Sequence, residues 1–362
     1  MGIALAAAAS VASVLANGVR AEGLRPQIQG PGSVARPVGL GGTPFRNGVL
    51  TERQGMFLMA SASAWSGSAW SGGVYTTPSG ETIHFYVSDS YQPNSAENQR
   101  WADYLGWLYH SDELSRLTVY MVRPSEVASF CGASATACYA PALQAMVVPG
   151  ESSGGWSIDQ IVAHEYGHHL ANNRINPPWD ALSWGTKRWS SYANICQRAQ
   201  QGTAFPGLTG GTYGFTAAEA FAEAFRVTNE LRVASSTTWP LIDSSFYPNA
   251  IARELIRLDA VQPWAGLSTA TTSRFTSYGG RVQGFTSRGP MDGTMTVSLT
   301  TQSGPNYEVQ LVDKSTGGVI DKAKTVRGSA TFTVTLCGQR SLAVRVRRNN
   351  SKIGTFSVVV TQ

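Results

Sequence analysis

Two patterns of hydrophobic and polar residues divide the chain. Between residues 81 and 266, a few short apolar runs come first, and most of the longer stretches, in which apolar residues recur every three or four positions, follow them. The short runs predict strands and the longer stretches predict helices. Strands followed by helices indicate an α+β domain. We expect strands at Ile83–Val87, Leu117–Val122 and, at a sheet edge, Ala145–Val148, and helices at about Glu97–Tyr109, Ile158–Asn172, Ala217–Leu231 and Ala250–Leu258.

From about residue 268 the pattern changes to β-branched runs separated by Gly, Asn, Asp and Ser. In one run, Leu342, Val344 and Val346 alternate with more polar positions, which is typical of a half-buried strand. We therefore expect residues 267–362 to form an all-β sandwich domain, similar in shape and position to the accessory domains of secreted bacterial peptidases. Its expected strands are Thr294–Leu299, Tyr307–Val312, Thr331–Thr335, Leu342–Val346 and Thr355–Val360.

The N-terminal segment has an apolar, alanine-rich run from Ile3 to Ala16, which is too short to span a bilayer. We expect residues 1–21 to be a secretory signal peptide, although no Lys or Arg precedes the run; the alternative is a plain alanine-rich helix. Residues 22–80 are rich in Gly, Pro and Ser, which favours a flexible leader or linker. No later stretch predicts a membrane span.

The composition narrows the class of protein. A charged fraction of 14% and a net charge of +5 describe a folded chain without the basic stripe of a nucleic-acid-binding protein. Export would permit disulfides, and Cys131 and Cys138 are close enough in sequence for a local bridge. The pairing of Cys196 with Cys337 stays open, because they lie in different expected domains; four buried thiols are the alternative.

The chemistry is concentrated in the segment His-Glu-Tyr-Gly-His, residues 164–168. Two histidines four positions apart on a helix lie on one face, so His164 and His168 can bind one metal ion. Zinc favours nitrogen ligands and leaves one position to water at a catalytic site. Glu165 can reach that water and take its proton as the water attacks a carbonyl. The alternative is a chance match on an ordinary amphipathic helix.

Local signals support a helix through this motif. Ser157 and Gln160 have the spacing of a capping box, which predicts a helix that begins at Ile158. Gly167 lowers helix propensity, and we expect it where a neighbouring backbone packs close to the metal. His169 points away from the face shared by the two candidate ligands. We therefore expect it to contact the ligand residues without binding the metal, or to pack in the core.

A catalytic zinc site needs a third protein ligand. A histidine six positions after His168, as in metzincins, is excluded because position 174 is Arg174, and no histidine follows His169. The next two candidates are Glu219 and Glu223, four apart on one expected helix. Glu219 also has the spacing of a capping box with Thr216, and in that case Glu223 would be the ligand.

The two motif segments together resemble a known family. His-Glu-Tyr-Gly-His, followed by Tyr-Gly and Glu-Ala-Phe-Ala-Glu-Ala-Phe-Arg at residues 213–226, is similar to the peptidase domain of anthrax lethal factor and its relatives in the gluzincin clan. This resemblance implies a zincin-like catalytic domain at residues 81–266 with one catalytic Zn²⁺. It also implies Glu219 as the third ligand, Glu223 as a supporting carboxylate, and Tyr213 as the phenol that steadies an oxyanion.

The sequence thus predicts a secreted zinc endopeptidase that acts on proteins or peptides, with no nucleic-acid partner; it predicts no oligomeric state. Two alternatives remain: an inactive zincin-like protein that binds or adheres, and a zinc hydrolase of another amide, such as peptidoglycan. Three tryptophans after the motif helix could line a substrate cleft or pack in the core; they are Trp179, Trp184 and Trp189.

Overall fold

The computed structural model describes residues 46–49, 70–133, 135–207, 213–287, 290–302 and 304–362. The expected signal peptide, residues 1–21, lies outside this part of the chain. The range 22–80, which we expected to be a leader or linker, contains two strands that pair with the main sheet, β1 (Arg46–Val49) and β2 (Trp70–Thr76). The boundary that we expected at residue 80, between the linker and the folded domain, is therefore too late. The Ser- and Gly-rich sequence of β2 forms an edge strand of the domain.

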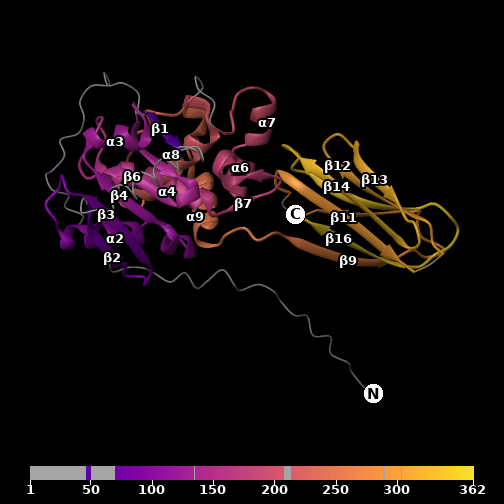
Figure 1. Cartoon of the computed structure of the whole chain (residues 1–362). Helices are drawn as coiled ribbons and strands as arrows, with labels where there is room; N and C mark the ends of the chain where they lie inside the picture. Colours follow the sequence, from indigo (N-terminus) through magenta and orange to yellow (C-terminus); the bar gives the residue numbers. More distant parts are fainter. Residues whose placement is uncertain (1–45, 50–69, 134, 208–212, 288–289, 303) are drawn as a thin grey trace, which may run out of the picture. The chain divides into compact units, whose positions relative to one another are not determined.

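A six-stranded sheet forms the framework of the N-terminal region, with strand order β1-β5-β6-β4-β3-β2 (Figure 1). Strands β3, β4 and β6 are parallel to one another, whereas β5 is antiparallel to β6 and β2 to β3. The edge position expected for residues 145–148 is wrong: β6 lies between β5 and β4, and all its residues are buried. The other strands are β3 (Thr82–Ser88), β4 (Thr118–Val122), β5 (Ala135–Ala140) and β6 (Ala145–Pro149).

Helices cover both faces of this sheet. Cys138 on β5 packs in a core with α3 (Pro124–Cys131), whereas the next residue, Tyr139, contacts His169 on α4 (Ile158–Asn172). Successive residues of a strand point to opposite faces, so α3 and α4 lie on opposite sides of the sheet. The expected bounds of the motif helix are confirmed, including the capping box at its start.

The helix that carries the motif is a central helix rather than an amphipathic surface helix. Every residue from 161 to 171 is buried, which is typical of a helix that is surrounded by protein. This helix also packs against α8 (Ala217–Glu230), and the two backbones lie close together at Gly167, where a Cβ atom would lie 2.8 Å from the Cα of Ala222. The expectation for Gly167 is therefore confirmed: its missing side chain lets a neighbouring backbone come close.

We expect Gly167→Ala to lower the free energy of unfolding by about 1–2 kcal/mol. The added methyl group must push α8 away from α4, and the gain in helix propensity of about 1 kcal/mol offsets only part of that cost. Urea unfolding measures the change. Gly284→Ala is the control, because no atom lies within 4 Å of a Cβ atom at Gly284. Wild-type stability of the Gly167→Ala protein would contradict the close packing of the two helices.

Shorter helices and one small hairpin complete this region, and no helix in the described ranges is both long and apolar enough to cross a bilayer. They are α2 (Ser95–Trp107), η1 (Asp112–Arg116), η2 (Pro141–Leu143), β7 (Ile175–Asn176), β8 (Trp179–Asp180), α5 (Ala181–Trp184), α6 (Lys187–Tyr192), α7 (Ile195–Gln200), η3 (Tyr213–Phe215), η4 (Ser244–Phe246) and α9 (Ala250–Val261).

The C-terminal region, residues 268–362, is β-rich as expected. Two four-stranded antiparallel sheets, ordered β10-β15-β12-β13 and β14-β11-β16-β9, share one apolar core. Inward residues such as Val297, Leu311 and Val344 are 2% exposed or less. The strands are β9 (Ser268–Arg274), β10 (Val282–Thr286), β11 (Gly293–Thr301), β12 (Tyr307–Asp313), β13 (Val319–Lys324), β14 (Ser329–Leu336), β15 (Leu342–Arg348) and β16 (Thr355–Thr361).

All four cysteines form disulfides. Cys131 and Cys138 join the end of α3 to β5, which is the local bridge expected from their spacing. Cys196 pairs with Cys337, a pairing that the sequence left open, and this bond links α7 to the segment after β14. A cross-link between residues so far apart in sequence restricts the unfolded chain strongly. The alternative of four buried thiols is wrong.

Candidate metal centre

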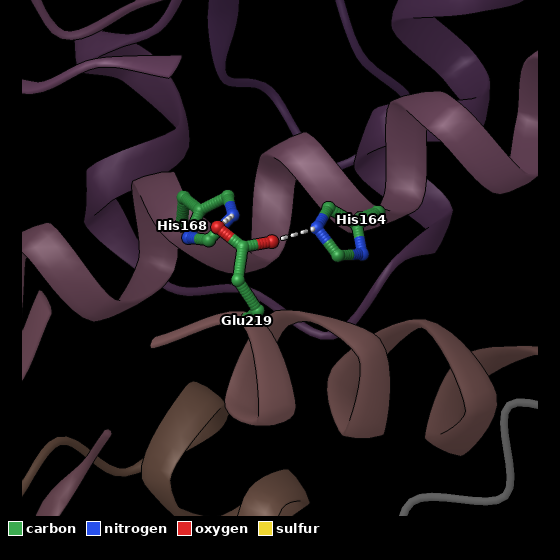
Figure 2. Close-up of side chains that lie close together, drawn as sticks. All are labelled: His164, His168 and Glu219. Carbon is green, nitrogen blue, oxygen red and sulfur yellow. Dashed lines mark hydrogen bonds and ion pairs between the residues drawn. The ribbon is translucent and has the colours of Figure 1, made fainter. Parts of the chain in front are cut away.

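Three side chains from two helices converge at one point. His164 and His168 project from neighbouring turns of α4, and Glu219 reaches toward them from the first turn of α8 (Figure 2). The Oε2 atom of Glu219 lies 3.1 Å from Nε2 of His164, and its Oε1 atom lies 3.5 Å from Nε2 of His168. One ligand atom from each residue lies within 4.8 Å of the other two. The structure therefore brings together the three residues expected to hold a metal.

The burial of these groups fits a metal ion. Each of the three residues is 1% exposed. Within the described ranges, neither ring nitrogen of His168 has a hydrogen-bond partner, and neither does Oε1 of Glu219. Buried polar atoms without partners are costly and usually mark a bound ion, a water molecule or a catalytic role. Two imidazole nitrogens and one carboxylate are a ligand set that zinc binds at catalytic sites.

The geometry separates the roles of the two glutamates on α8. Glu219 does not use Oε1 to cap the helix, because this atom accepts no hydrogen bond from any described residue and lies beside Nε2 of His168. Glu223 contacts the far side of the same histidine: its Oε2 atom lies 3.2 Å from Nδ1 of His164. A carboxylate at Nδ1 fixes the orientation of the ring and leaves Nε2 to face the site. Glu223 therefore lies behind His164 rather than beside the other ligand atoms.

Arg226, to which the sequence alone assigned no role, holds Glu223 in place. Its Nε and Nη2 atoms donate to the two oxygens of Glu223 at 2.9 and 2.6 Å, and the arginine is fully buried. Nη1 donates to Glu230 at 2.5 Å. The spacing of these three residues, i, i+3 and i+7, is a helical charge pattern that could have revealed the pair. A bidentate pair of this kind, with one hydrogen bond to each oxygen, fixes the orientation of the carboxylate group.

Glu165 lies next to the first histidine and is completely buried. Neither of its carboxylate oxygens has a hydrogen-bond partner among the residues that the structure describes. Burial raises the pKa of Glu165 to about 8, although the charge of His164 acts in the opposite direction. A carboxyl group with a pKa near neutral can both take and return a proton.

The two histidines differ in their electrostatic surroundings. Burial acts to lower the pKa of His164, but hydrogen bonds with Glu219 and Glu223 outweigh burial and raise the pKa to about 10. Burial lowers the pKa of His168. Burial acts to raise the pKa of Glu219, but the two histidines outweigh it and hold this pKa well below its usual range. Metal binding would therefore release a proton from His164, since a ligand nitrogen must be unprotonated.

Tyr213 lies at the edge of the same group of side chains. It belongs to η3, just before α8, and its hydroxyl donates to Oε2 of Glu219 at 2.9 Å. Burial and the charge of Glu219 raise the pKa of Tyr213 well above its ordinary value, so its hydroxyl keeps its proton. The structure thus places the phenol within hydrogen-bond distance of one expected ligand.

His169 faces away from this site. Its Nδ1 atom lies 3.1 Å from the hydroxyl of Tyr139, and its Nε2 atom lies 2.8 Å from the carbonyl oxygen of Glu113. Both ring nitrogens are engaged on the side of the sheet, so His169 packs α4 against β5 and η1. Its position fits a packing role rather than metal binding.

A buried ion pair that the sequence analysis missed anchors the end of α4. Glu113 is fully buried and accepts hydrogen bonds from the Tyr166 hydroxyl at 2.7 Å and from Arg174 at 2.8 Å. Tyr166 lies within the motif itself, so this contact restrains the turn that carries both histidines. The partners are 53 and 61 residues apart in sequence, and no local pattern indicates such a pair.

The three tryptophans after the motif helix divide between two environments. Trp189 is 1% exposed and packs against Phe221 of α8, so it belongs to the core. Trp179 and Trp184 are half-buried and stack on each other, with ring centroids 4.6 Å apart. Trp179 also lines a surface pocket beside the β7–β8 hairpin. Core packing is thus shown for Trp189 alone.

Comparisons with known proteins show no family for this chain. No family model matches it, and no curated protein matches it. Solved structures that are similar include the pre-peptidase C-terminal domain of a collagenase from Bacillus anthracis, with 15% identity, 25% of this chain and 87% of that chain covered, and a TM-score of 0.21.

A mitogen from Yersinia pseudotuberculosis is 14% identical, with 26% of this chain and 85% of that chain covered and a TM-score of 0.22. A periplasmic inhibitor of g-type lysozyme from Aeromonas hydrophila is 13% identical, with 27% of this chain and 89% of that chain covered and a TM-score of 0.22. At these TM-scores the similarities carry no argument about function.

Proposed function

We propose that this protein is a secreted zinc endopeptidase with a zincin-like, gluzincin-type site. One observation carries the proposal: a buried His164, His168 and Glu219 converge from two helices beside Glu165, whose buried carboxylate has no partner in the described ranges. The His-Glu-x-x-His spacing supplies two ligands and a base from one helix, and the second helix supplies an acidic ligand. This combination supports amide hydrolysis better than a purely structural site, which would need no free base.

The two histidines and Glu219 would hold the zinc ion, with Glu223 and Arg226 fixing the ring of His164 from behind. When bound there, zinc would lower the pKa of a water molecule and polarise the substrate carbonyl. The protein's own contribution is a rigid, buried ligand set, because both α4 and its contacts with α8 are buried. Rigid placement of ligands lowers the cost of reaching the reactive geometry.

Glu165 would act as the general base. One Oε atom takes the proton from the attacking water, and the same carboxyl then passes it to the leaving nitrogen. Burial disfavours its charged form, which makes the carboxylate a stronger base toward the attacking water. The hydroxyl of Tyr213 would turn from Glu219 to donate to the oxyanion that forms on the substrate carbonyl. Each role thus belongs to a residue whose side chain lies at the site.

Three further features support export and a peptide substrate. Both disulfides fit an oxidising compartment, and the apolar N-terminal run fits a secretory signal. The similarity of residues 164–168 and 213–226 to the gluzincin pattern favours peptide bonds over other amides.

The test combines metal analysis with cleavage profiling of the purified full chain. We expect one zinc ion per chain, cleavage of a peptide library detected by mass spectrometry, loss of cleavage with 1,10-phenanthroline, and recovery when zinc is restored. Cleavage that is unaffected by the chelator would contradict the proposal. Bound zinc with no peptide cleavage would also contradict it: release of fragments from purified peptidoglycan would then favour the other hydrolase, and no hydrolysis would favour an inactive binding protein.

A further inference from the structure

Charge is distributed unevenly along the chain. Residues 267–362 contain 12 Lys and Arg and 4 Asp and Glu, a formal charge of +8. The first 266 residues contain 16 Lys and Arg and 19 Asp and Glu, a formal charge of −3, and the two values add to the +5 of the whole chain. The C-terminal β region is therefore a strongly basic module attached to a slightly acidic one, and basic surfaces attract anionic partners.

Four of these cations lie on one face of the β10-β15-β12-β13 sheet. Arg345 and Arg347 on β15 alternate with buried Val344 and Val346, so their side chains point away from the core. On β13, Ala323 packs against the core, which turns Lys322 and Lys324 to the same outer face. Three of the four are exposed and Arg345 is half-buried.

The strand register places these cations in two rows across the sheet. The first row consists of three register partners on adjacent strands, Lys322, Gln310 and Arg345, and it ends at Gly284 on β10. The second row contains Lys324, Glu308 and Arg347 and ends at Val282. Since neighbouring strands lie about 4.8 Å apart, the two cations of a row are about 10 Å apart.

The cations of this face have no acidic partner within salt-bridge distance in the described ranges. The only carboxylate in the two rows is that of Glu308, which is 6% exposed and accepts a hydrogen bond from Gln310 at 2.5 Å. Four positive charges against one buried negative charge leave a positive face on a rigid sheet. Like charges held this close repel one another, and an anionic partner relieves that repulsion.

We propose that this outer face of the C-terminal β region, around Arg345, Arg347, Lys322 and Lys324, binds an acidic polysaccharide. The described positions of the face include no aromatic side chain, whereas single-stranded nucleic acids are usually held by aromatic stacking. A flat sheet face has no element that enters a DNA groove. Acid groups that recur along a sugar polymer can meet both rows, and the exposed Val282 can contact the C–H face of a sugar ring.

The experiment measures binding of the full-length protein to heparin, with neutral dextran as the negative control, at about 0.15 M NaCl, where weak surface attraction is screened. The Arg345→Gln/Arg347→Gln protein should bind heparin at least about tenfold more weakly than wild type. The matched control is Lys314→Gln/Lys352→Gln, which removes the same charge from loop positions outside the strands; it should change binding by less than about twofold.

Equal weakening by both double variants would overturn the proposal, because net charge alone would then explain binding. Failure to bind heparin, or tighter binding to duplex DNA or to phosphatidylserine vesicles, would also overturn it. If the arginine variant has a lower thermal midpoint than the control, Lys322→Gln/Lys324→Gln on the edge strand β13 gives the same comparison, with the same tenfold expectation. The assay measures no hydrolysis, so its result is independent of the proposed peptidase activity.

Discussion

The Glu165→Gln protein is expected to keep its zinc and to lose peptidase activity by about 10²–10⁴ in kcat, the usual contribution of a general base. Gln has the shape of Glu but cannot accept and return the proton. The substitution breaks no hydrogen bond in the described ranges, because both oxygens of Glu165 lack a partner there. The fold and the three ligands should therefore persist. Steady-state kinetics on one cleaved peptide, together with metal analysis, measures both quantities.

The matched control is Glu254→Gln, which makes the same chemical change at a carboxylate that pairs with Arg257 on the exposed side of α9. It should leave both kcat and zinc content at wild-type values. A Glu165→Gln protein that keeps more than about half of the wild-type kcat would contradict the assignment of the base. Loss of zinc from this protein would instead show that Glu165 supports the ligands, which would contradict its proposed role.

Elements with a strong local signal were predicted closely. The capping box at Ser157 fixes the start of α4, and the two histidines share a face because of helix geometry alone. In the C-terminal region, the expected strands correspond to β11, β12, β14, β15 and β16. All but β14 lie inside their sheets, where burial of one face produces a clear alternation of apolar and polar residues.

The missed strands of this region, β9, β10 and β13, are all edge strands. Their sequences are polar or interrupted by glycine, as in the segment Val-Ile-Asp-Lys-Ala-Lys of β13. Edge strands have one unpaired side, and charged residues there prevent pairing with other chains. β2 is also an edge strand, and its Ser- and Gly-rich sequence is typical of a linker rather than of a strand. Pairing with a neighbour, rather than its own pattern, makes such a segment a strand.

The candidate site shows the same limit. Two of the proposed ligands and the proposed base come from five consecutive residues, so the sequence predicts them directly. The choice between Glu219 and Glu223 stayed open on the residues alone, because both lie on one helix face and the partner histidine is 55 residues away from Glu219. The anchor formed by Glu113 and Arg174 was not predicted at all, because contacts between distant segments leave no periodic signal.

A paired comparison of Glu219→Gln and Glu223→Gln should give the largest change in metal affinity. We expect Glu219→Gln to raise the zinc Kd by about a thousandfold or more, ~4 kcal/mol, because an amide replaces a charged ligand. Glu223→Gln should raise it by about 10–100-fold, the usual cost of losing a carboxylate that orients a histidine. Competition with a chromophoric zinc chelator measures both. A larger loss for Glu223→Gln would reverse the two roles, and unchanged affinity in both proteins would show that the convergence of α4 and α8 does not hold zinc.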